Sequence, residues 1–296
     1  MDGLTVRVLK AEELEALPKF WKDSVGVPVE LRFLKRWYQW DPEGFRVAVN
    51  SSGRILGMAT VMKQNDTLYV MGYMGVDKEF RSKGIAKRLL ANVISRSPSA
   101  SYALNASGDK ISIYLRRGFK VVEDSYAYAY VGKYAVVPEK TSQVDVEFVR
   151  VTPESAHVNE MGAYDQETCG FKRNVALLHL GDSNAICMMV KRKGKVVGYG
   201  KIQHYLLGGA WLGPVYADDA LVARWLIDSL VRQFESQRCT FLFTVLSEQA
   251  RPIAQSYKMM LADKLSRCYL KPDSQQQPPP SVKKVFAFDD PGFTLF

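Results

Sequence analysis

The stretch GVDKEFRSKGIAKRLL, residues 75–90, joins the end of an apolar strand to a basic turn and the start of an apolar helix. Arg81 and Lys83 place positive charge in the turn, and Gly84 contributes no side chain. The first N–H groups of a helix lack intrahelical partners and form the positive end of the helix dipole. The stretch therefore predicts an anion-binding loop at the start of a helix spanning residues 84–96.

The loop has the form expected for binding a pyrophosphate. Its backbone N–H groups can point at phosphate oxygens, Gly84 allows a close approach, and Ala86 keeps the first helical turn thin. The chain contains neither the G-x-x-x-x-G-K-[ST] loop of nucleotide hydrolases nor the G-x-G-x-x-G turn of dinucleotide folds. A phosphorylated ligand of another class is therefore expected.

Strands and helices alternate around this loop. The hydrophobic pattern predicts, in order, strand 4–9, helices 11–22 and 29–39, hairpin 45–62, strand 66–76, helix 84–96, strand 101–106, helix 108–117 and strand 119–131. This order predicts an α/β fold with a mixed, largely antiparallel sheet flanked by helices, and a ligand at the carboxyl ends of its strands.

The hairpin recurs later in the chain. VAVNSSGRILGMATV, residues 47–61, has a counterpart in MMVKRKGKVVGYGKI, residues 188–202, and each copy follows a helical stretch and a strand. The glycines fall at matching places: Gly53 and Gly57 in the first copy, Gly194 and Gly198 in the second. We therefore expect two tandem copies of one fold, with domains at residues 1–138 and 139–296. The proline-rich stretch 274–284 is expected to be an exposed connector before a short strand at 285–288.

Composition narrows the function further. The 40 Lys and Arg against 31 Asp and Glu favour a partner that carries phosphates, but the basic residues are spread along the chain, so nucleic acid is a weak candidate. No apolar run reaches the ~20 residues of a membrane span, and a secretory signal pattern is absent, so we expect a soluble, cytoplasmic protein with no membrane partner. Four widely spaced cysteines predict neither a metal site nor a disulfide framework.

Residues 75–90 resemble motif A of the GNAT acyltransferase superfamily, whose Arg/Gln-x-x-Gly-x-Gly/Ala loop holds the pyrophosphate of acetyl-CoA. LNASGDKISIYLRRGFKVV, residues 104–122, resembles the motif B of that superfamily. The whole chain is similar to the two-domain proteins typified by bacterial YitH and their animal relatives, in which WLGPVYAD (211–218) and SRCYL (266–270) would belong to the second domain.

The resemblance implies an N-acetyltransferase that uses acetyl-CoA or another acyl-CoA as co-substrate and needs no metal. The residues that it implies for CoA binding are Met74, Gly75, Val76, Arg81, Ser82, Lys83, Gly84, Ile85, Ala86, Lys87, Asn105 and Tyr114. Free N–H groups near Met74–Val76 would polarise the thioester carbonyl. Tyr114 is the implied catalytic residue, which protonates the leaving thiolate.

The family pattern is incomplete in one respect. Many members carry a glutamate in the middle of the strand before the loop, as a base for the amine, but TLYVMGYMG, residues 67–75, has none. Possible bases elsewhere are Glu30, Asp41, Asp66, Glu79, Asp165 and His204, and the sequence favours none of them. The helix LRFLKRWYQW, residues 31–40, can serve as a core stripe or as a wall of the acceptor site.

Several functions remain open at this point. The leading hypothesis is direct transfer, in a ternary complex, of an acetyl or short acyl group to a primary amine of a small molecule bound between the copies. A protein N-acetyltransferase and a non-catalytic acyl-CoA-binding or sensing protein are the alternatives. The oligomeric state is not predicted.

The second copy lacks the anion loop. Where the first copy has the basic turn, the second has YADDALVA, residues 216–223, whose Asp218 and Asp219 would cap the helix and repel a pyrophosphate. Tyr257 matches Tyr114, but the glycine that follows it in the first copy is replaced by leucine. We therefore expect one CoA per chain, with the second copy as a scaffold whose residues 204–216 reach the acceptor pocket.

Overall fold

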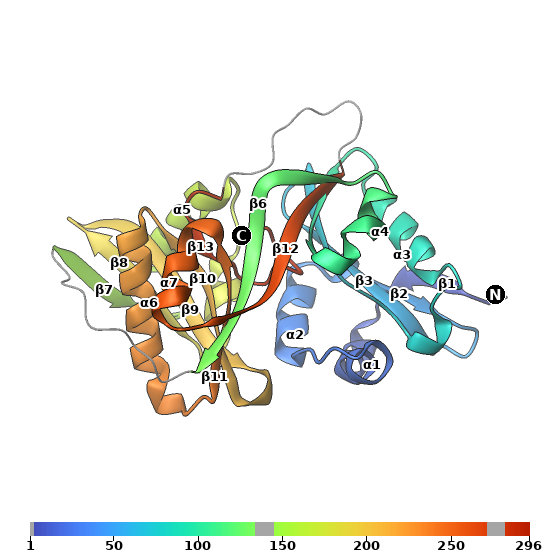
Figure 1. Ribbon diagram of the computed structural model, residues 1–296, viewed down its shortest axis with the longest axis horizontal. Helices are drawn as coiled ribbons and strands as arrows, with labels where there is room; N and C mark the ends of the chain where they lie inside the picture. Colours follow the sequence, from blue (N-terminus) through green and yellow to red (C-terminus); the bar gives the residue numbers. More distant parts are fainter. Residues whose placement is uncertain (1–2, 134–144, 271–281) are drawn as a thin grey trace.

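One continuous sheet runs through both lobes of the molecule in the computed structural model, which describes residues 3–133, 145–270 and 282–296 (Figure 1). The strand order is β1-β2-β3-β4-β5-β12-β6-β11-β13-β10-β9-β8-β7. The strands are β1 (Thr5–Val8), β2 (Phe45–Val49), β3 (Ile55–Lys63), β4 (Leu68–Val76), β5 (Ser101–Ser107), β6 (Lys120–Lys133), β7 (Val146–Arg150), β8 (Ile186–Arg192), β9 (Lys195–Tyr205), β10 (Gly209–Ala217), β11 (Phe241–Ser247), β12 (Met260–Leu270) and β13 (Val285–Ala287). The mixed, largely antiparallel sheet is as predicted.

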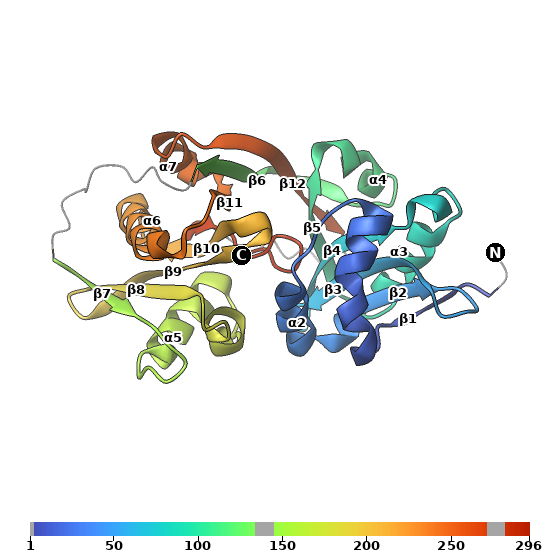
Figure 2. The ribbon, with the colours of Figure 1, turned by 90° about the horizontal axis from the view of Figure 1, so that it is seen from below.

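Helices cover both faces of this sheet (Figure 2). The α-helices are α1 (Leu17–Phe20), α2 (Leu31–Trp40), α3 (Ile85–Ile94), α4 (Ile111–Leu115), α5 (Val158–Cys169), α6 (Ala220–Phe234) and α7 (Arg251–Ser256). The π-helical segments are η2 (Trp21–Val25) and η6 (Ala176–Leu180), and the 3₁₀ segments are η1 (Ala11–Ala16), η3 (Pro42–Gly44), η4 (Lys78–Phe80), η5 (Gly108–Lys110), η7 (Leu206–Gly208), η8 (Glu235–Gln237) and η9 (Glu248–Ala250). No helix among the described residues is both long and apolar enough to cross a bilayer.

The repeated hairpin is confirmed. The pairs β2–β3 and β8–β9 are antiparallel. Their tips are turned by Gly53 at φ +82° and Gly194 at φ +77°, a backbone conformation that favours glycine. The predicted helix 11–22 is instead broken into η1, α1 and η2. Pro18 stands at the start of α1 and has no N–H to continue a helix from the preceding turn.

The two lobes exchange strands, which the sequence analysis did not anticipate. Strand β12, from the second half, pairs with β5 over Ser107 to Tyr102 and also with β6. Strand β6, from the first half, pairs in turn with β11. The stretch 266–270, expected to belong to the second domain, therefore lies in a ladder with the first lobe. These two long strands cross between the lobes in Figure 1.

The chain segment after β12 returns to the middle of the molecule. Strand β13 confirms the predicted short strand at 285–288, and the C-terminus lies between the two lobes (Figures 1 and 2). The proposed boundary at residues 138 and 139, and most of the predicted connector 274–284, lie outside the described residues.

Candidate active site

Strands β4 and β5 part in the middle of the first lobe. Their parallel pairing is limited to residues Leu68–Val70 of β4, which pair with Ser101–Ala103 of β5. On the opposite edge of β4, the ladder to β3 is interrupted by a bulge in which Ala59 faces Tyr73 and Met74, and Tyr73 has φ +42°. The predicted residue Met74 lies in this bulge, and Gly75 and Val76 follow it, at the gap between the two strands. Donors there are free of the β4–β5 ladder.

The basic loop leads from the end of β4 into α3. Residues 81–84 are exposed, Gly84 has φ +81°, and no side chain caps the helix. A Cβ at Gly84 would meet nothing within 4 Å, so the space in front of the helix is open. Arg81 is held against the strand, since its Nε donates to the Val76 carbonyl at 3.2 Å. The N–H groups at Ile85, Ala86 and Lys87 thus begin an uncapped helix, as an anion site requires.

A basic groove continues from this loop between α3 and α4. Its cavity of about 500 Å³ is lined by Lys87, Leu90, Ala91, Ile94, Arg116 and Arg117. Lys87 was predicted, whereas the two arginines were not, although the RRG sequence after Tyr114 places two cations at the end of a motif helix. The groove offers three positive charges beside apolar methylene groups, a surface that suits a phosphorylated nucleoside.

Tyr114 lies on α4 and is partly buried. Its ring packs edge-on against Phe119, with ring centroids 5.7 Å apart. Burial raises the pKa of the Tyr114 hydroxyl above its ordinary value. The hydroxyl has no hydrogen-bond partner among the residues that the structure describes. A phenol that keeps its proton at neutral pH can donate it to a developing thiolate.

Asn105 lies on β5, and its amide contacts the segment at the C-terminal end of the chain. Its Nδ2 donates to the carbonyl of Pro291 at 2.9 Å, so the side chain holds the segment 289–296 that follows β13. The sequence analysis did not place this segment near the site, because nothing local in residues 289–296 shows where tertiary packing brings them.

The five carboxylates and the histidine considered as bases have contacts of their own. Asp41 forms an ion pair with Arg96, Glu79 with Arg54, and Asp66 with Lys63. Glu30 approaches Arg32, His204 approaches Gln237, and Asp165 forms a fully buried pair with Arg173 in the second lobe. None of these pairs lies at the gap between β4 and β5.

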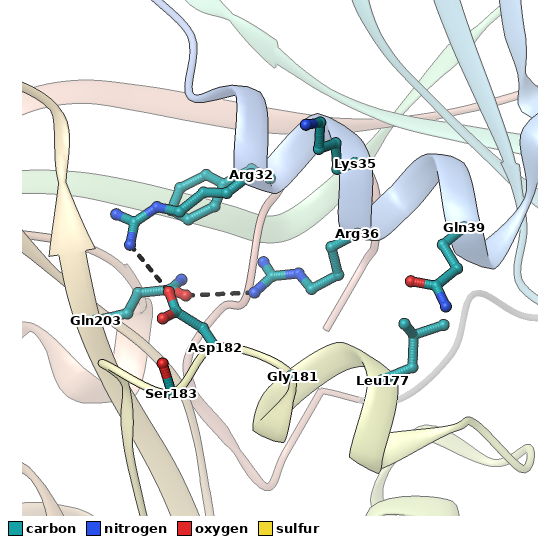
Figure 3. Close-up of a pocket in the computed structure, with 10 residues that line it drawn as sticks. Arg32, Lys35, Arg36, Gln39, Leu177, Gly181, Asp182, Ser183 and Gln203 are labelled. Carbon is teal, nitrogen blue, oxygen red and sulfur yellow. Dashed lines mark hydrogen bonds and ion pairs between the residues drawn. The ribbon is translucent and has the colours of Figure 1, made fainter. Parts of the chain in front are cut away.

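A second cavity, of about 340 Å³, lies between the lobes against α2 (Figure 3). Arg32 Nη1 contacts Asp182 Oδ2 at 2.9 Å, and Arg36 Nη1 donates to Gln203 Oε1 at 3.3 Å, so both arginines reach from α2 to the second lobe. Phe33 belongs to the buried core, as the core-stripe reading of helix 31–40 predicts, and also lines this cavity. The second lobe lines the cavity with Leu177, Gly181, Asp182, Ser183 and Gln203, and residues 204–216 are not among the lining residues.

Comparison with known families identifies two matching regions. Residues 29–131 and residues 161–286 each match a family described as an acetyltransferase (GNAT) domain. No curated protein sequence matches the chain significantly.

Several solved structures share the whole two-lobed fold. A Pyrococcus horikoshii protein described as an acetyltransferase superposes with a TM-score of 0.75 at 16% identity, covering 99% of this chain and 97% of its own. A GCN5-related N-acetyltransferase from Sphaerobacter thermophilus gives a TM-score of 0.68 at 12% identity, covering 92% and 97%. A tandem GNAT protein from the clavulanic acid biosynthesis pathway gives 0.65 at 10% identity, covering 90% and 98%. At these identities the likeness concerns the fold alone.

Proposed function

We propose that this chain, an enzyme built of two tandem acetyltransferase (GNAT) domains, transfers an acetyl or short acyl group from acyl-CoA to a primary amine of a small molecule. The transfer is direct and takes place in a ternary complex. We also propose the domain division at residue 138 and the narrower kinship with YitH-type proteins. A cytoplasmic location accords with the free thiols of Cys169, Cys187, Cys239 and Cys268.

In this proposal, different residues of the first lobe bind acyl-CoA and assist the transfer. The uncapped start of α3, with Arg81, Ser82 and Lys83 before it, binds the pyrophosphate through backbone N–H groups and positive charge. The groove with Arg116 and Arg117 takes the remaining phosphate and the nucleoside. Backbone donors after the β4 bulge polarise the thioester carbonyl, and Tyr114 protonates the departing thiolate. Described residues contain no cluster of three metal-binding side chains, and the chemistry requires none.

The proposal that the acceptor is a small molecule rests on the cavity between α2 and the second lobe. It is bounded on one side by Arg32 and Arg36 and on the other by Asp182 and Gln203, so the second lobe stands where a protein substrate would need an open groove (Figure 3). A volume of about 340 Å³ suits a small molecule. The absence of a glutamate on β4 favours one alternative, a non-catalytic acyl-CoA-binding protein.

Release of CoA thiol tests the proposal. The purified chain is incubated with acetyl-CoA and a panel of primary amines that includes 2-phenylethylamine and amino acids, with a lysine-containing peptide as the protein-substrate arm. We expect amine-dependent thiol release with small amines and little with the peptide. Binding of acetyl-CoA without thiol release in any arm would favour the non-catalytic alternative instead.

A further inference from the structure

The segment 289–296 spans the gap between β4 and β5. On the β4 side, the backbone of Gly292 packs so closely on Gly72 that no Cβ would fit there. On the β5 side, the carbonyl of Pro291 accepts the Asn105 amide at 2.9 Å. The residues that follow are tied down as well, because Gln64 Nε2 donates to the Phe293 carbonyl at 3.0 Å. The turn at residues 290–292 is therefore fixed at the place where the two strands part.

This turn carries a buried carboxylate, Asp290, which is only 4% exposed. The Tyr73 hydroxyl donates to Asp290 Oδ2 at 3.0 Å, and the Gly292 N–H donates to Oδ1 at 2.9 Å. Tyr73 is the residue of the β4 bulge with φ +42°, so the bulge itself aims the phenol at the carboxylate. Phe293 stacks on the Tyr73 ring with centroids 4.5 Å apart and fixes the pair in place.

We propose that Asp290 is the catalytic base of the acyl transfer, which accepts the proton of the acceptor amine and replaces the carboxylate that β4 lacks. This inference rests on the proposed function. An N–H bond of the ammonium breaks and an O–H bond forms on Asp290. The freed nitrogen lone pair then attacks the thioester carbonyl and forms the C–N bond, the C–S bond breaks, and the thiolate takes the Tyr114 proton. The second proton that the nitrogen loses as the amide forms passes through solvent to the Tyr114 oxygen and restores the phenol. Tyr73 orients the carboxylate through its hydrogen bond.

The surroundings of Asp290 make it a stronger base than an ordinary carboxylate. Burial raises the pKa of Asp290 to about 6, and the neighbouring Asp289 acts in the same direction. The Gly292 N–H, the Tyr73 hydroxyl and Arg36 of α2 act against this shift. From β9, Tyr205 also faces the group; burial raises the pKa of the Tyr205 hydroxyl, and Asp290 raises it further. The carboxylate is thus ionised at neutral pH and ready to accept a proton.

Asp289 does not compete for this role. It faces two cations, Arg36 and Lys201, with N–O distances of 3.6 Å each, so its charge is compensated between the lobes. Removing it would leave these buried cations without their partner, a costly change. Asp66 is a better control, because it is an exposed carboxylate on the β3–β4 turn.

The test compares Asp290→Asn with Asp66→Asn, using 2-phenylethylamine and the other amines of the panel. Asparagine keeps the shape of the side chain and can still accept the Gly292 N–H. We expect kcat/KM at pH 7 to fall by ~10²–10⁴-fold in Asp290→Asn, with unchanged affinity for acetyl-CoA, and to stay at the wild-type value in Asp66→Asn.

The pH profile separates a lost base from a disturbed structure. In the wild type, kcat/KM should fall below about pH 6, because protonated Asp290 cannot accept the proton. In Asp290→Asn, only amine that is already neutral can attack, so kcat/KM should rise about tenfold per pH unit towards the pKa of the amine itself. Tyr73→Phe removes a hydrogen bond to the ionised form, so its acid limb should move to higher pH.

The outcomes of these experiments separate a wrong role for Asp290 from a wrong proposed function. Wild-type activity in Asp290→Asn would overturn the role of Asp290 while the proposed function stands. If the wild type binds acetyl-CoA but transfers to no amine, the proposed function fails and this inference with it. Should Asp290→Asn not fold, an acid limb that Tyr73→Phe leaves in place would overturn the proposal.

Discussion

The two lobes begin corresponding helices in opposite ways. Helix α3 in the first lobe starts at Gly84 with no side-chain cap, behind an exposed basic loop. Helix α6 in the second lobe is capped by Asp219, whose carboxylate accepts the Val222 N–H at 2.8 Å. The predicted cap is therefore confirmed for Asp219, whereas Asp218 accepts the Tyr164 hydroxyl at 3.0 Å instead. A carboxylate at a helix start takes up one of the free N–H groups and opposes the positive field of the helix dipole, so it disfavours a phosphate there.

The gaps between the central strands differ as well. In the second lobe, β10 and β11 pair in parallel over three residues and then part, just as β4 and β5 do. Strand β13 fills that second gap, since Ala287 pairs with Val215 of β10 and with Leu246 of β11. In the first lobe the turn at 290–292 crosses the start of the gap, at Gly72 and Asn105, and no strand among the described residues pairs with both β4 and β5 there. One copy has thus kept an opening for a ligand, and the other has closed it with its own chain.

Even the matched tyrosines are used differently. Tyr257 is buried, and its hydroxyl donates to Asp228 at 2.5 Å, whereas the Tyr114 hydroxyl has no partner within the described parts of the chain. The comparison teaches that the same position serves packing in one copy and remains available for chemistry in the other.

The largest difference between the two lobes is expected for the matched substitutions Tyr114→Phe and Tyr257→Phe. We expect Tyr114→Phe to lower kcat by ~10²–10⁴-fold with little change in the affinity for acetyl-CoA, since thiolate charge develops only in the transition state. Tyr257→Phe should leave kcat unchanged and lower the free energy of unfolding by about 1.5–3 kcal/mol, because it loses a hydrogen bond to a charged group. Steady-state kinetics and urea unfolding measure the two effects. Equal losses of kcat and affinity in Tyr114→Phe would reduce that residue to a packing role.

A smaller effect is expected on binding. The double change Arg81→Glu with Gly84→Glu puts negative charge where the pyrophosphate should lie, and we expect the affinity for acetyl-CoA to fall by about 100-fold or more. A matched control is Lys193→Glu with Gly194→Glu, at the exposed hairpin tip of the second lobe, where the glycine has a similar positive φ. Calorimetry should find the control unchanged. Similar affinities for the two double variants would contradict the phosphate site.

The smallest effect concerns the helix cap. Asp219→Ala should lower the free energy of unfolding by about 1 kcal/mol, because the Val222 N–H loses its acceptor. Affinity for acetyl-CoA should not change, since α6 takes no part in binding. If this variant gained a second acetyl-CoA site, the Asp219 cap alone would account for the lack of binding in the second lobe. That result would contradict the view that β13 closes the gap there.

Local patterns in the sequence were sufficient for the repeated hairpin, the open loop at Gly84 and the cap at Asp219. Each of these depends on a few neighbouring residues, so its structure follows from turn and capping chemistry. The exchange of β6 and β12, the insertion of β13 and the approach of Asp290 to Tyr73 could not be predicted. They join residues far apart in the chain, and no local pattern specifies which strand edge or gap a distant segment will fill.

The stoichiometry of acetyl-CoA binding tests the central claim most directly. Because α3 begins without a side-chain cap whereas its counterpart α6 is capped by Asp219, and because β13 pairs across the gap between β10 and β11, we expect about one acetyl-CoA per chain in a calorimetric titration of the full chain. The Arg81→Glu, Gly84→Glu variant should show none at the same concentrations. Two sites of comparable affinity, or one site that survives that double change, would contradict the account.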